Sequence, residues 1–264
     1  MRKIIDFHNH IYPDKIAIKA TNSIKRFYDI DMDCIGDCAN LLKFGDIAGI
    51  NKFVVQSVAT TPEQVTKIND YIAEECKEYP DRFIGFGTMH PDFENISDEI
   101  DRIISIGLKG VKLHPDFQKF NIDDKKAFEI YDACNGRLPI LMHTGDFRYD
   151  YSHPKRLVSV FDNFKDLTVI AAHFGGWGIW DEAESYMKRF NCYMDTSSSF
   201  DFMPRRKIRR LIDELGADRF VYGTDFPMWN PKYELIYLDS IGLNDEDMDK
   251  ILYKNAEKIL DIKL

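Results

Sequence analysis

The chain has 264 residues, of which 44% are hydrophobic and 30% are charged, a composition typical of a globular protein with a large core. Its formal net charge is −9, which disfavours a partner with a phosphate backbone, so we expect no nucleic-acid binding. No signal segment opens the chain and no apolar run approaches the roughly 20 residues needed to cross a bilayer. We therefore expect a cytoplasmic protein without a membrane partner.

The first predicted element is a strand whose end turns polar. An apolar run at residues 4–5 leads into Asp6-Phe7-His8-Asn9-His10. Side chains alternate across a strand, so Asp6, His8 and His10 share one face. Two neighbouring imidazoles can hold a divalent metal at about 2.0–2.1 Å per nitrogen, if further ligands come from elsewhere. A solvated strand end with two unrelated histidines is the alternative, and the rest of the chain decides between them.

Short apolar runs predict seven further strands, and helix-like spacing separates them. The strands are expected at 53–58, 83–88, 110–114, 139–143, 168–173, 192–196 and 220–225. The helices are expected at 14–28, 35–48, 61–79, 96–104, 123–134, 154–164, 181–190, 205–215 and 245–260. Alternating strands and helices indicate a parallel sheet. Eight such repeats in a chain of this length predict an α/β fold, a (β/α)8 TIM barrel, as a single domain over residues 1–264. An open doubly wound sheet is less favoured, because no G-x-G-x-x-G follows the first strand.

Most of the histidines fall at the ends of the predicted strands. In a barrel the active site forms at the carboxyl ends of the strands, and buried positions are otherwise apolar. Histidines without a shared role would be scattered over helices and loops, and only His153 is clearly placed that way. The positions at or beside strand ends are His8, His10, His114, His143 and His173, with Asp225 at the end of the eighth strand. This pattern predicts a metal site at the mouth of the barrel.

We predict that His8, His10, His143 and Asp225 bind one divalent ion, which we expect to be zinc. Imidazoles plus a carboxylate, with one position left for water, is the arrangement that zinc adopts in hydrolytic sites. Asp225 would also take the proton of a metal-bound water. His173 is assigned to proton transfer, because an imidazole titrates near neutral pH and can protonate a leaving group or a carbanion.

Four residues are predicted to bind the substrate. His114 either contacts the substrate or packs between the strand end and Pro115. Lys112, on the same strand face, either holds a substrate carboxylate or, as a carbamate, bridges two metal ions. Arg148 suits an anionic substrate because its guanidinium forms a fork. Trp177 follows a strand end and can wall a pocket for a planar substrate, although ordinary loop packing explains Arg148 and Trp177 equally well.

These motifs resemble the amidohydrolase-related branch of the amidohydrolase superfamily, which includes aminocarboxymuconate-semialdehyde decarboxylase, resorcylate decarboxylases and small lactone hydrolases. The resemblance covers nearly the whole chain. The matching segments are Asp6–His10, Gly110–Pro115, Met142–Gly145, Ala172–Gly176, Tyr222–Pro227 and Asn255–Ala256. It implies a (β/α)8 barrel with one zinc or similar ion on His8, His10, His143 and Asp225, and a catalytic His173.

Our leading hypothesis for the reaction is hydrolysis of a small, carboxylated ester, lactone or amide by metal-activated water. The alternative is non-oxidative decarboxylation of an aromatic or enol-like acid, in which protonated Asp225 or His173 delivers a proton to carbon. A barrel that only senses a ligand is a third hypothesis, disfavoured because no ligand or acid–base position is missing. The expected partner is a small-molecule substrate, and we expect a homodimer.

Overall fold

A computed structural model describes residues 2–264. The chain divides into two units. The first unit comprises Met1–Gln56, Asp81–Phe83 and Thr196–Leu264, and the second comprises Ser57–Pro80 and Ile84–Asp195. The expectation of a single domain over residues 1–264 remains a prediction. Among the residues that the structure describes, no helix has the length and apolar character needed to cross a bilayer.

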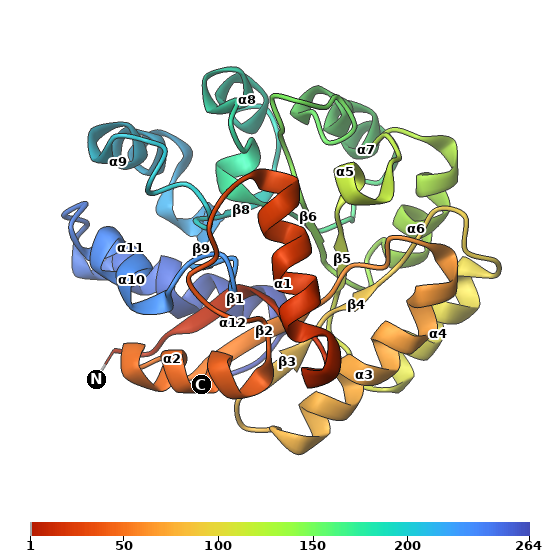
Figure 1. The fold of residues 1–264 in the computed structure, drawn as a ribbon. Coiled ribbons are helices and arrows are strands. Elements are labelled where there is room, and N and C mark those ends of the chain that lie inside the picture. The colour runs from red at the N-terminus through yellow and green to blue at the C-terminus, as the bar shows by residue number, and fades with distance from the viewer. Residues whose placement is uncertain (1) are drawn as a thin grey trace. The chain divides into compact units, whose positions relative to one another are not determined.

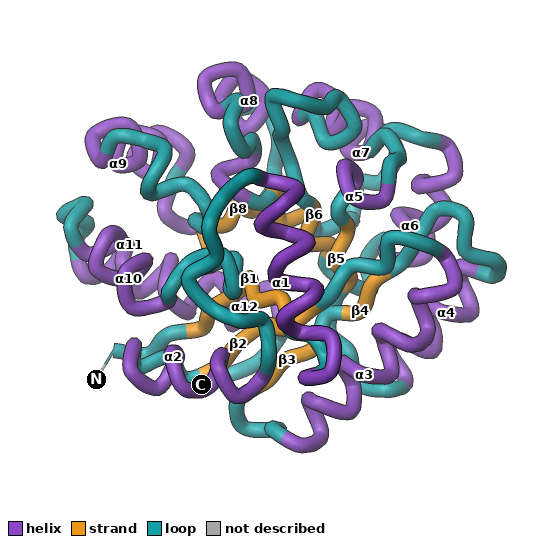
Figure 2. Tube along the Cα trace, viewed as in Figure 1, coloured by secondary structure: helices purple, strands orange, loops and turns teal. Residues whose placement is uncertain are grey.

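The first unit is built around strand β1 (Ile5–His10), which is buried along its whole length. β1 pairs in parallel with β2 (Lys52–Gln56), and the register shifts between Asp6 and Asn9. On its other side, β1 receives the chain that continues from β9 (Phe220–Val221): the amide of Phe7 donates to the carbonyl of Tyr222 at 2.8 Å. Segments near the start and toward the end of the sequence therefore meet at β1, which Figures 1 and 2 show beside β2.

Helices cover the strands of the first unit, and the approach is close where α2 crosses β2. A Cβ atom on Gly45 of α2 would lie 2.1 Å from the ring of Phe53, so only glycine fits there. The helices and helical turns of this unit are α1 (Asp14–Tyr28), α2 (Cys38–Ala48), α9 (Arg205–Leu215), η4 (Ala217–Arg219), α10 (Pro231–Asp239), α11 (Asp245–Asp249), η5 (Lys250–Lys254) and α12 (Asn255–Leu260).

The second unit holds five adjacent parallel strands in sequence order (Figure 2). They are β4 (Gly87–Thr88), β5 (Val111–Leu113), β6 (Ile140–Met142), β7 (Val169–Ala171) and β8 (Tyr193–Asp195), while β3 (Phe83–Gly85) begins in the first unit and ends in the second. The helices and helical turns are η1 (Pro62–Gln64), α3 (Val65–Glu78), α4 (Ile96–Ser105), α5 (Pro115–Gln118), α6 (Lys125–Cys134), η2 (Pro154–Arg156), α7 (Leu157–Asn163), η3 (His173–Gly175) and α8 (Trp180–Met187).

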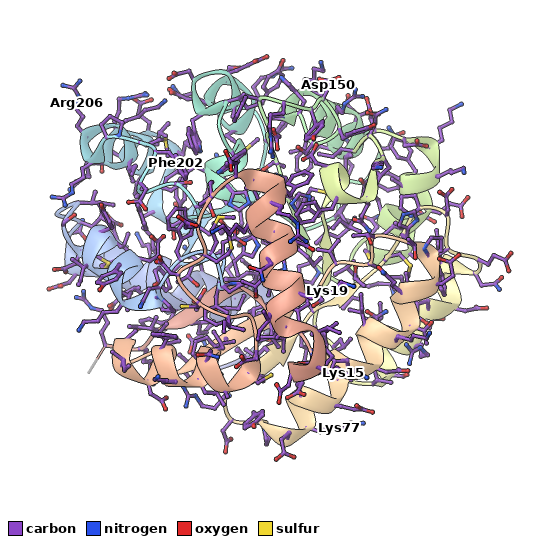
Figure 3. The ribbon with its side chains drawn as sticks, viewed as in Figure 1. Lys15, Lys19, Lys77, Asp150, Phe202 and Arg206 are labelled. Atoms are coloured by element: carbon purple, nitrogen blue, oxygen red, sulfur yellow. The ribbon has the colours of Figure 1, made fainter. Side chains whose placement is uncertain are left out.

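Burial follows the apolar pattern of each element. The strands β5, β6 and β7 are fully buried, and all of their residues are apolar except Lys112. Helix α9 buries one apolar stripe, formed by Ile208, Leu211, Ile212 and Leu215, and exposes Arg205, Arg206 and Arg210. On α1, Lys15 and Lys19 are exposed (Figure 3). Strands buried on both faces and helices with one apolar stripe are the pattern of a parallel α/β sheet.

The predicted elements are present, most of them with different ends. Helices 14–28 and 205–215 match α1 and α9. The predicted helix over 35–48 begins at Cys38, because Asp37 caps it by accepting from the amide of Asn40 at 2.7 Å. The strands are shorter than predicted, and the run over 83–88 is divided into β3 and β4. The predicted eighth strand stops at Val221, and Thr224 instead donates its amide to the Asp6 side chain.

Candidate functional site

The face of β1 predicted to bind metal presents two imidazoles to each other. Strand alternation puts His8 and His10 on one side, and their Nε2 atoms lie 3.2 Å apart. Both rings are buried, with 1% and 7% of their residue surface exposed. Two nitrogens held this close, away from solvent, can supply half of a tetrahedral metal shell.

Asp225 supplies a third donor atom to this pair. Its Oδ1 lies 3.3 Å from Nε2 of His8 and 3.4 Å from Nε2 of His10. The residue has a φ of 58°, in the left-handed region, and it follows Thr224, whose amide and hydroxyl both donate to Asp6. The loop after β9 is thus tied to the start of β1, and this tie brings Asp225 to the two histidines.

The donor set of His8, His10 and Asp225 fits a divalent ion. Neighbouring ligand atoms about 2.0–2.2 Å from one ion lie about 2.8–3.6 Å apart in tetrahedral or octahedral geometry. The three separations here, 3.2, 3.3 and 3.4 Å, fall within that range. These residues form one of the groups in the described chain whose ligand atoms can hold a metal ion.

Two serines that were not predicted from the sequence hydrogen-bond to His8 and Asp225. Ser197 Oγ lies 3.1 Å from Nδ1 of His8. When Nδ1 carries the proton and donates to Ser197, the Nε2 lone pair faces the other two ligands. Ser198 donates to Oδ2 of Asp225 at 2.7 Å and accepts from the indole of Trp229 at 2.9 Å. The signal in the sequence is the run of serines directly after the predicted seventh strand.

Asp6 shares the face of the two histidines, but its carboxyl group hydrogen-bonds to Thr224 and to the backbone of His8. It is fully buried, and burial raises its pKa to about 7 although the hydrogen bonds from Thr224 lower it. Both of its oxygens accept from Thr224, and Oδ1 also accepts from the amide of His8. Asp6 therefore holds the backbone of the site in place.

The second unit contains another histidine cluster. His143 follows β6, and its Nδ1 lies 3.0 Å from Nε2 of His173, which follows β7. The ring of His114 stacks on that of His143 with centroids 3.9 Å apart. All three are buried. The carboxyl ends of three neighbouring strands thus place their histidines together, as predicted for parallel strands.

Two carboxylates that the sequence analysis did not assign belong to this cluster. Asp116 Oδ2 lies 3.5 Å from Nε2 of His143 and accepts from Ser152 at 2.5 Å. Burial raises the pKa of Asp116 to about 6. Asp195, at the end of β8, accepts from the amide of His173 at 2.9 Å. Asp195 ends a strand as Asp225 was predicted to do, so the same signal could have identified it.

The predicted substrate-binding residues also lie in the second unit. Lys112 is buried, with 1% exposed. The guanidinium of Arg148 forms a fork with Asp146, at 2.9 Å from Nε and 2.6 Å from Nη2. It also lies 5.6 Å from the ring centroid of Trp177, which stacks on Phe147. Arg148 is therefore held by its own carboxylate against an aromatic wall.

Within the units, the structure brings together His8, His10 and Asp225 in one and His143, His173 and His114 in the other. The four-ligand set and the individual roles predicted for these residues remain predictions. Three of the four predicted ligands lie in the first unit and His143 lies in the second.

The sequence and the fold were compared with those of known proteins. The sequence profile of the amidohydrolase family matches residues 5–262. The curated gamma-resorcylate decarboxylase of Polaromonas sp. is 24% identical over 81% of this chain and 82% of its own length. A TIM-barrel protein of Bordetella bronchiseptica superposes with a TM-score of 0.80 at 23% identity, covering 98% of both chains. A 5-carboxyvanillate decarboxylase of Novosphingobium aromaticivorans, solved with manganese and a nitrobenzoic acid, gives a TM-score of 0.78 at 19% identity, covering 99% of this chain and 96% of that one.

These likenesses confirm the predicted (β/α)8 barrel and contradict the leading hypothesis for the reaction. The expectation of a metal-dependent hydrolase was wrong, because the named relative and the named solved neighbour are decarboxylases. The physical reason is that both reactions use the same ligand types and the same acid–base groups, so the strand-end pattern does not separate them. Membership of a family does not depend on whether the reaction is hydrolysis or decarboxylation. Because the family profile spans almost the whole sequence, the chain belongs to the amidohydrolase family.

Proposed function

We propose that the chain is a metal-dependent, non-oxidative decarboxylase of a small aromatic acid. The observation that carries the proposal is the triangle of His8 Nε2, His10 Nε2 and Asp225 Oδ1, with sides of 3.2–3.4 Å. The gamma-resorcylate decarboxylase that aligns over most of this chain supports the choice of reaction.

His8, His10 and Asp225 would hold the ion, with the predicted His143 as a fourth ligand. A bound divalent ion supplies positive charge that attracts the anionic oxygens of the substrate. Two imidazoles and a carboxylate suit zinc, the ion expected from the sequence, and they also suit manganese, which the Novosphingobium neighbour contains. We propose one divalent ion per chain and keep zinc and manganese as the two candidates.

The chain must also deliver a proton to carbon. The proton adds to the ring carbon that bears the carboxylate, the bond to the carboxyl carbon breaks, and its electron pair restores the aromatic ring as CO2 leaves. We assign this proton to Asp225, whose second oxygen Ser198 fixes at 2.7 Å. The predicted His173, buried next to His143, is the second proton-transfer residue of the proposal.

The remaining predicted residues supply binding groups for an aromatic acid. Lys112 and Arg148 have basic side chains, and His114 and Trp177 have flat rings. We propose that they contact the carboxylate and the ring of the substrate, with Asp146 keeping Arg148 in its orientation.

A panel of hydroxylated benzoic acids tests the reaction. The purified chain, reconstituted with zinc or with manganese, is incubated with each acid, and the masses of the products are determined by mass spectrometry. We expect a product that has lost one CO2, and we expect His8→Ala to abolish it. His153→Gln is the matched control, since His153 pairs with Glu182 at 3.1 Å outside the histidine clusters. Products that gain one water instead, or no CO2 release from any acid, would overturn the proposal.

The assembly and location expected from the sequence are also proposals. We propose a single-domain homodimer in the cytoplasm, on the sequence alone. Sedimentation equilibrium tests whether the chain is a dimer, and cell fractionation tests whether it is cytoplasmic. A monomeric mass, or recovery in a membrane or secreted fraction, would contradict them.

A further inference from the structure

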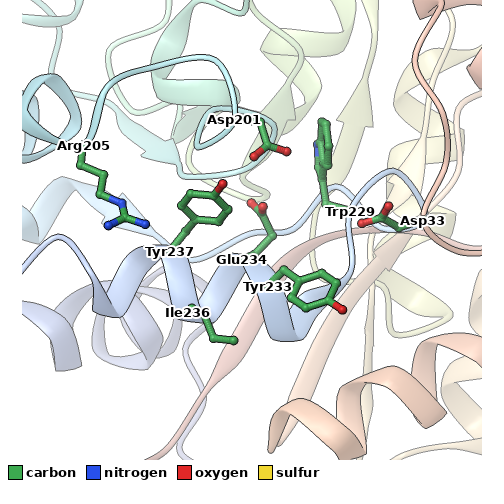
Figure 4. Close-up of a pocket in the computed structure, with 8 residues that line it drawn as sticks. All are labelled: Asp33, Asp201, Arg205, Trp229, Tyr233, Glu234, Ile236 and Tyr237. Atoms are coloured by element: carbon green, nitrogen blue, oxygen red, sulfur yellow. The ribbon is translucent and has the colours of Figure 1, made fainter.

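A pocket of the first unit lies outside the proposed decarboxylase site. It is a cavity of about 380 Å³ beside α10, with the carboxyl groups of Asp33, Asp201 and Glu234 and the rings of Trp229, Tyr233 and Tyr237 in its wall (Figure 4). Its volume is in the range of small-molecule sites, about 300–1,000 Å³. Nothing in the proposed reaction uses this pocket.

Glu234 is the unusual group in this wall. Only 3% of its surface is exposed, and among the described residues none hydrogen-bonds to its Oε2 atom. Figure 4 shows its side chain directed into the pocket, toward Asp201 and Tyr237. A buried carboxyl oxygen without a partner costs free energy, so it calls for a ligand that brings a donor.

The charges around Glu234 favour a cation as that ligand. Burial raises the pKa of Glu234 well above its ordinary value, and the carboxylates of Asp201, Asp6, Asp225 and Asp33 raise it further. An incoming positive charge would relieve this repulsion and ionise Glu234. The wall also contains one basic residue, Arg205, but an anion would meet the carboxyl groups of Asp33, Asp201 and Glu234 there and be repelled.

The aromatic rings of the wall suit the same kind of ligand. Cations bind to the faces of aromatic rings, and the guanidinium of Arg205 already lies 5.5 Å from the ring centroid of Tyr237. Trp229 is fixed by its indole hydrogen bond to Ser198, at 2.9 Å. A ligand with an apolar stem can lie against these rings while its charged end meets Glu234.

A single metal ion fits less well than an organic cation. Within residues 2–264, the groups of three side chains whose ligand atoms lie within 4.8 Å of one another do not include the carboxyls of this pocket. We propose that the pocket beside α10 binds a small aliphatic ammonium ion, with its N–H groups on Glu234 Oε2 and its carbon chain against Trp229 and Tyr237. The proposal does not depend on the reaction at the histidine site.

Calorimetric titration with n-butylammonium chloride tests this proposal. The full chain is titrated near neutral pH in two buffers of different ionisation enthalpy, at constant ionic strength, and n-butanol is the uncharged probe of equal length. We expect saturable binding of the amine, weaker binding of the alcohol, and release of a proton as Glu234 ionises. No binding of the amine, or equal affinity for the alcohol, would overturn the proposal.

Variants locate the site. Glu234→Gln keeps the shape but not the charge, and we expect its dissociation constant to rise at least about tenfold. Glu257→Gln is the matched control: Glu257 is also buried, but it accepts from the amide of Leu264 at 2.7 Å, outside this pocket. Asp201→Asn, at an exposed position, replaces Glu234→Gln if that variant fails to fold, and it should weaken binding in the same direction. Unchanged affinity in the folded variant would place the amine elsewhere.

Discussion

His8 has a neighbour at each nitrogen of its ring. Nδ1 lies 3.1 Å from Ser197 Oγ, and Nε2 lies 3.2 Å from Nε2 of His10. A hydrogen bond at one nitrogen selects the tautomer and the ring orientation, and so it sets the metal affinity of the other. Ser197 therefore acts on the proposed ion through His8.

We expect Ser197→Ala to weaken metal binding about 10–100-fold, because partners that orient metal ligands have effects of this size. Affinity is measured by competition with a chelator of known strength. Ser199→Ala is the matched control, since Ser199 is buried as well but its hydroxyl donates to the carbonyl of Ser197. An unchanged affinity in Ser197→Ala would remove the serine from the account of the site.

Glu234 should make the stability of the chain depend on pH. Its pKa in the folded state is raised by burial, so the folded chain holds a proton that the unfolded chain loses. Its stabilising contribution is complete below the unfolded pKa of about 4.3 and is lost as pH rises toward the folded pKa.

In this window Glu234 alone lowers the free energy of unfolding by about 1.4 kcal/mol per pH unit. Glu234→Gln should remove that slope, and urea unfolding at several pH values above 5, roughly one unit past the unfolded pKa, compares the two chains. Parallel pH profiles for wild type and variant would show that Glu234 is ionised in the folded state.

Single residues also show where sequence reasoning stopped. His8, His10 and Asp225 were predicted to converge because strand alternation and strand ends are legible in sequence. The hydrogen bonds of Ser197, Asp116 and similar supporting residues depend on side chains far apart in sequence, which no local pattern reports.

Among the elements, helices with one apolar stripe were predicted well and α10 was missed. α9 matches its predicted range because its apolar residues recur every three or four positions. α10 buries Glu234 and exposes Tyr233 and Ile236, at 58% and 54%. A helix that buries a carboxyl and exposes apolar residues does not show the amphipathic pattern, so the spacing of apolar residues did not predict α10.

Strand ends were overestimated for a related reason. The predicted strands 139–143 and 220–225 include the polar residues His143 and Asp225, but in the structure β6 ends at Met142 and β9 ends at Val221. After Val221, Thr224 bonds to Asp6 and Asp225 takes a positive φ. Tertiary hydrogen bonds therefore override the local pattern where the chain positions ligands.

The two faces of α9 should contribute very differently to stability. Leu211 is 2% exposed, and Leu211→Ala should cost about 2–5 kcal/mol because it leaves a cavity. Arg210 is exposed and pairs with Glu214 at 3.1 Å, and Arg210→Ala should cost less than about 1 kcal/mol because exposed ion pairs contribute little. Guanidinium unfolding measures both, and equal losses would contradict the assignment of the buried face.

At the scale of the molecule, fold and family were predictable but the reaction was not. Repeated strand–helix units specify a barrel, and the order of the motifs specifies the family. Hydrolysis needs a reacting water, and decarboxylation needs a proton delivered to carbon. Which of the two occurs depends on how the substrate lies beside the proposed metal ligands, and composition and motif spacing do not encode this. The relatives, not the pattern, support the proposed decarboxylation.

The central claim is that His8, His10 and Asp225 hold one divalent ion on which loss of CO2 depends. Metal-free chain, prepared with a chelator, is titrated with zinc or manganese while CO2 release from 2,6-dihydroxybenzoate is recorded. The account predicts no release without metal, and a linear rise that levels off at about one ion per chain. Release that persists in metal-free protein, or that is equally metal-dependent in His8→Ala, would contradict it.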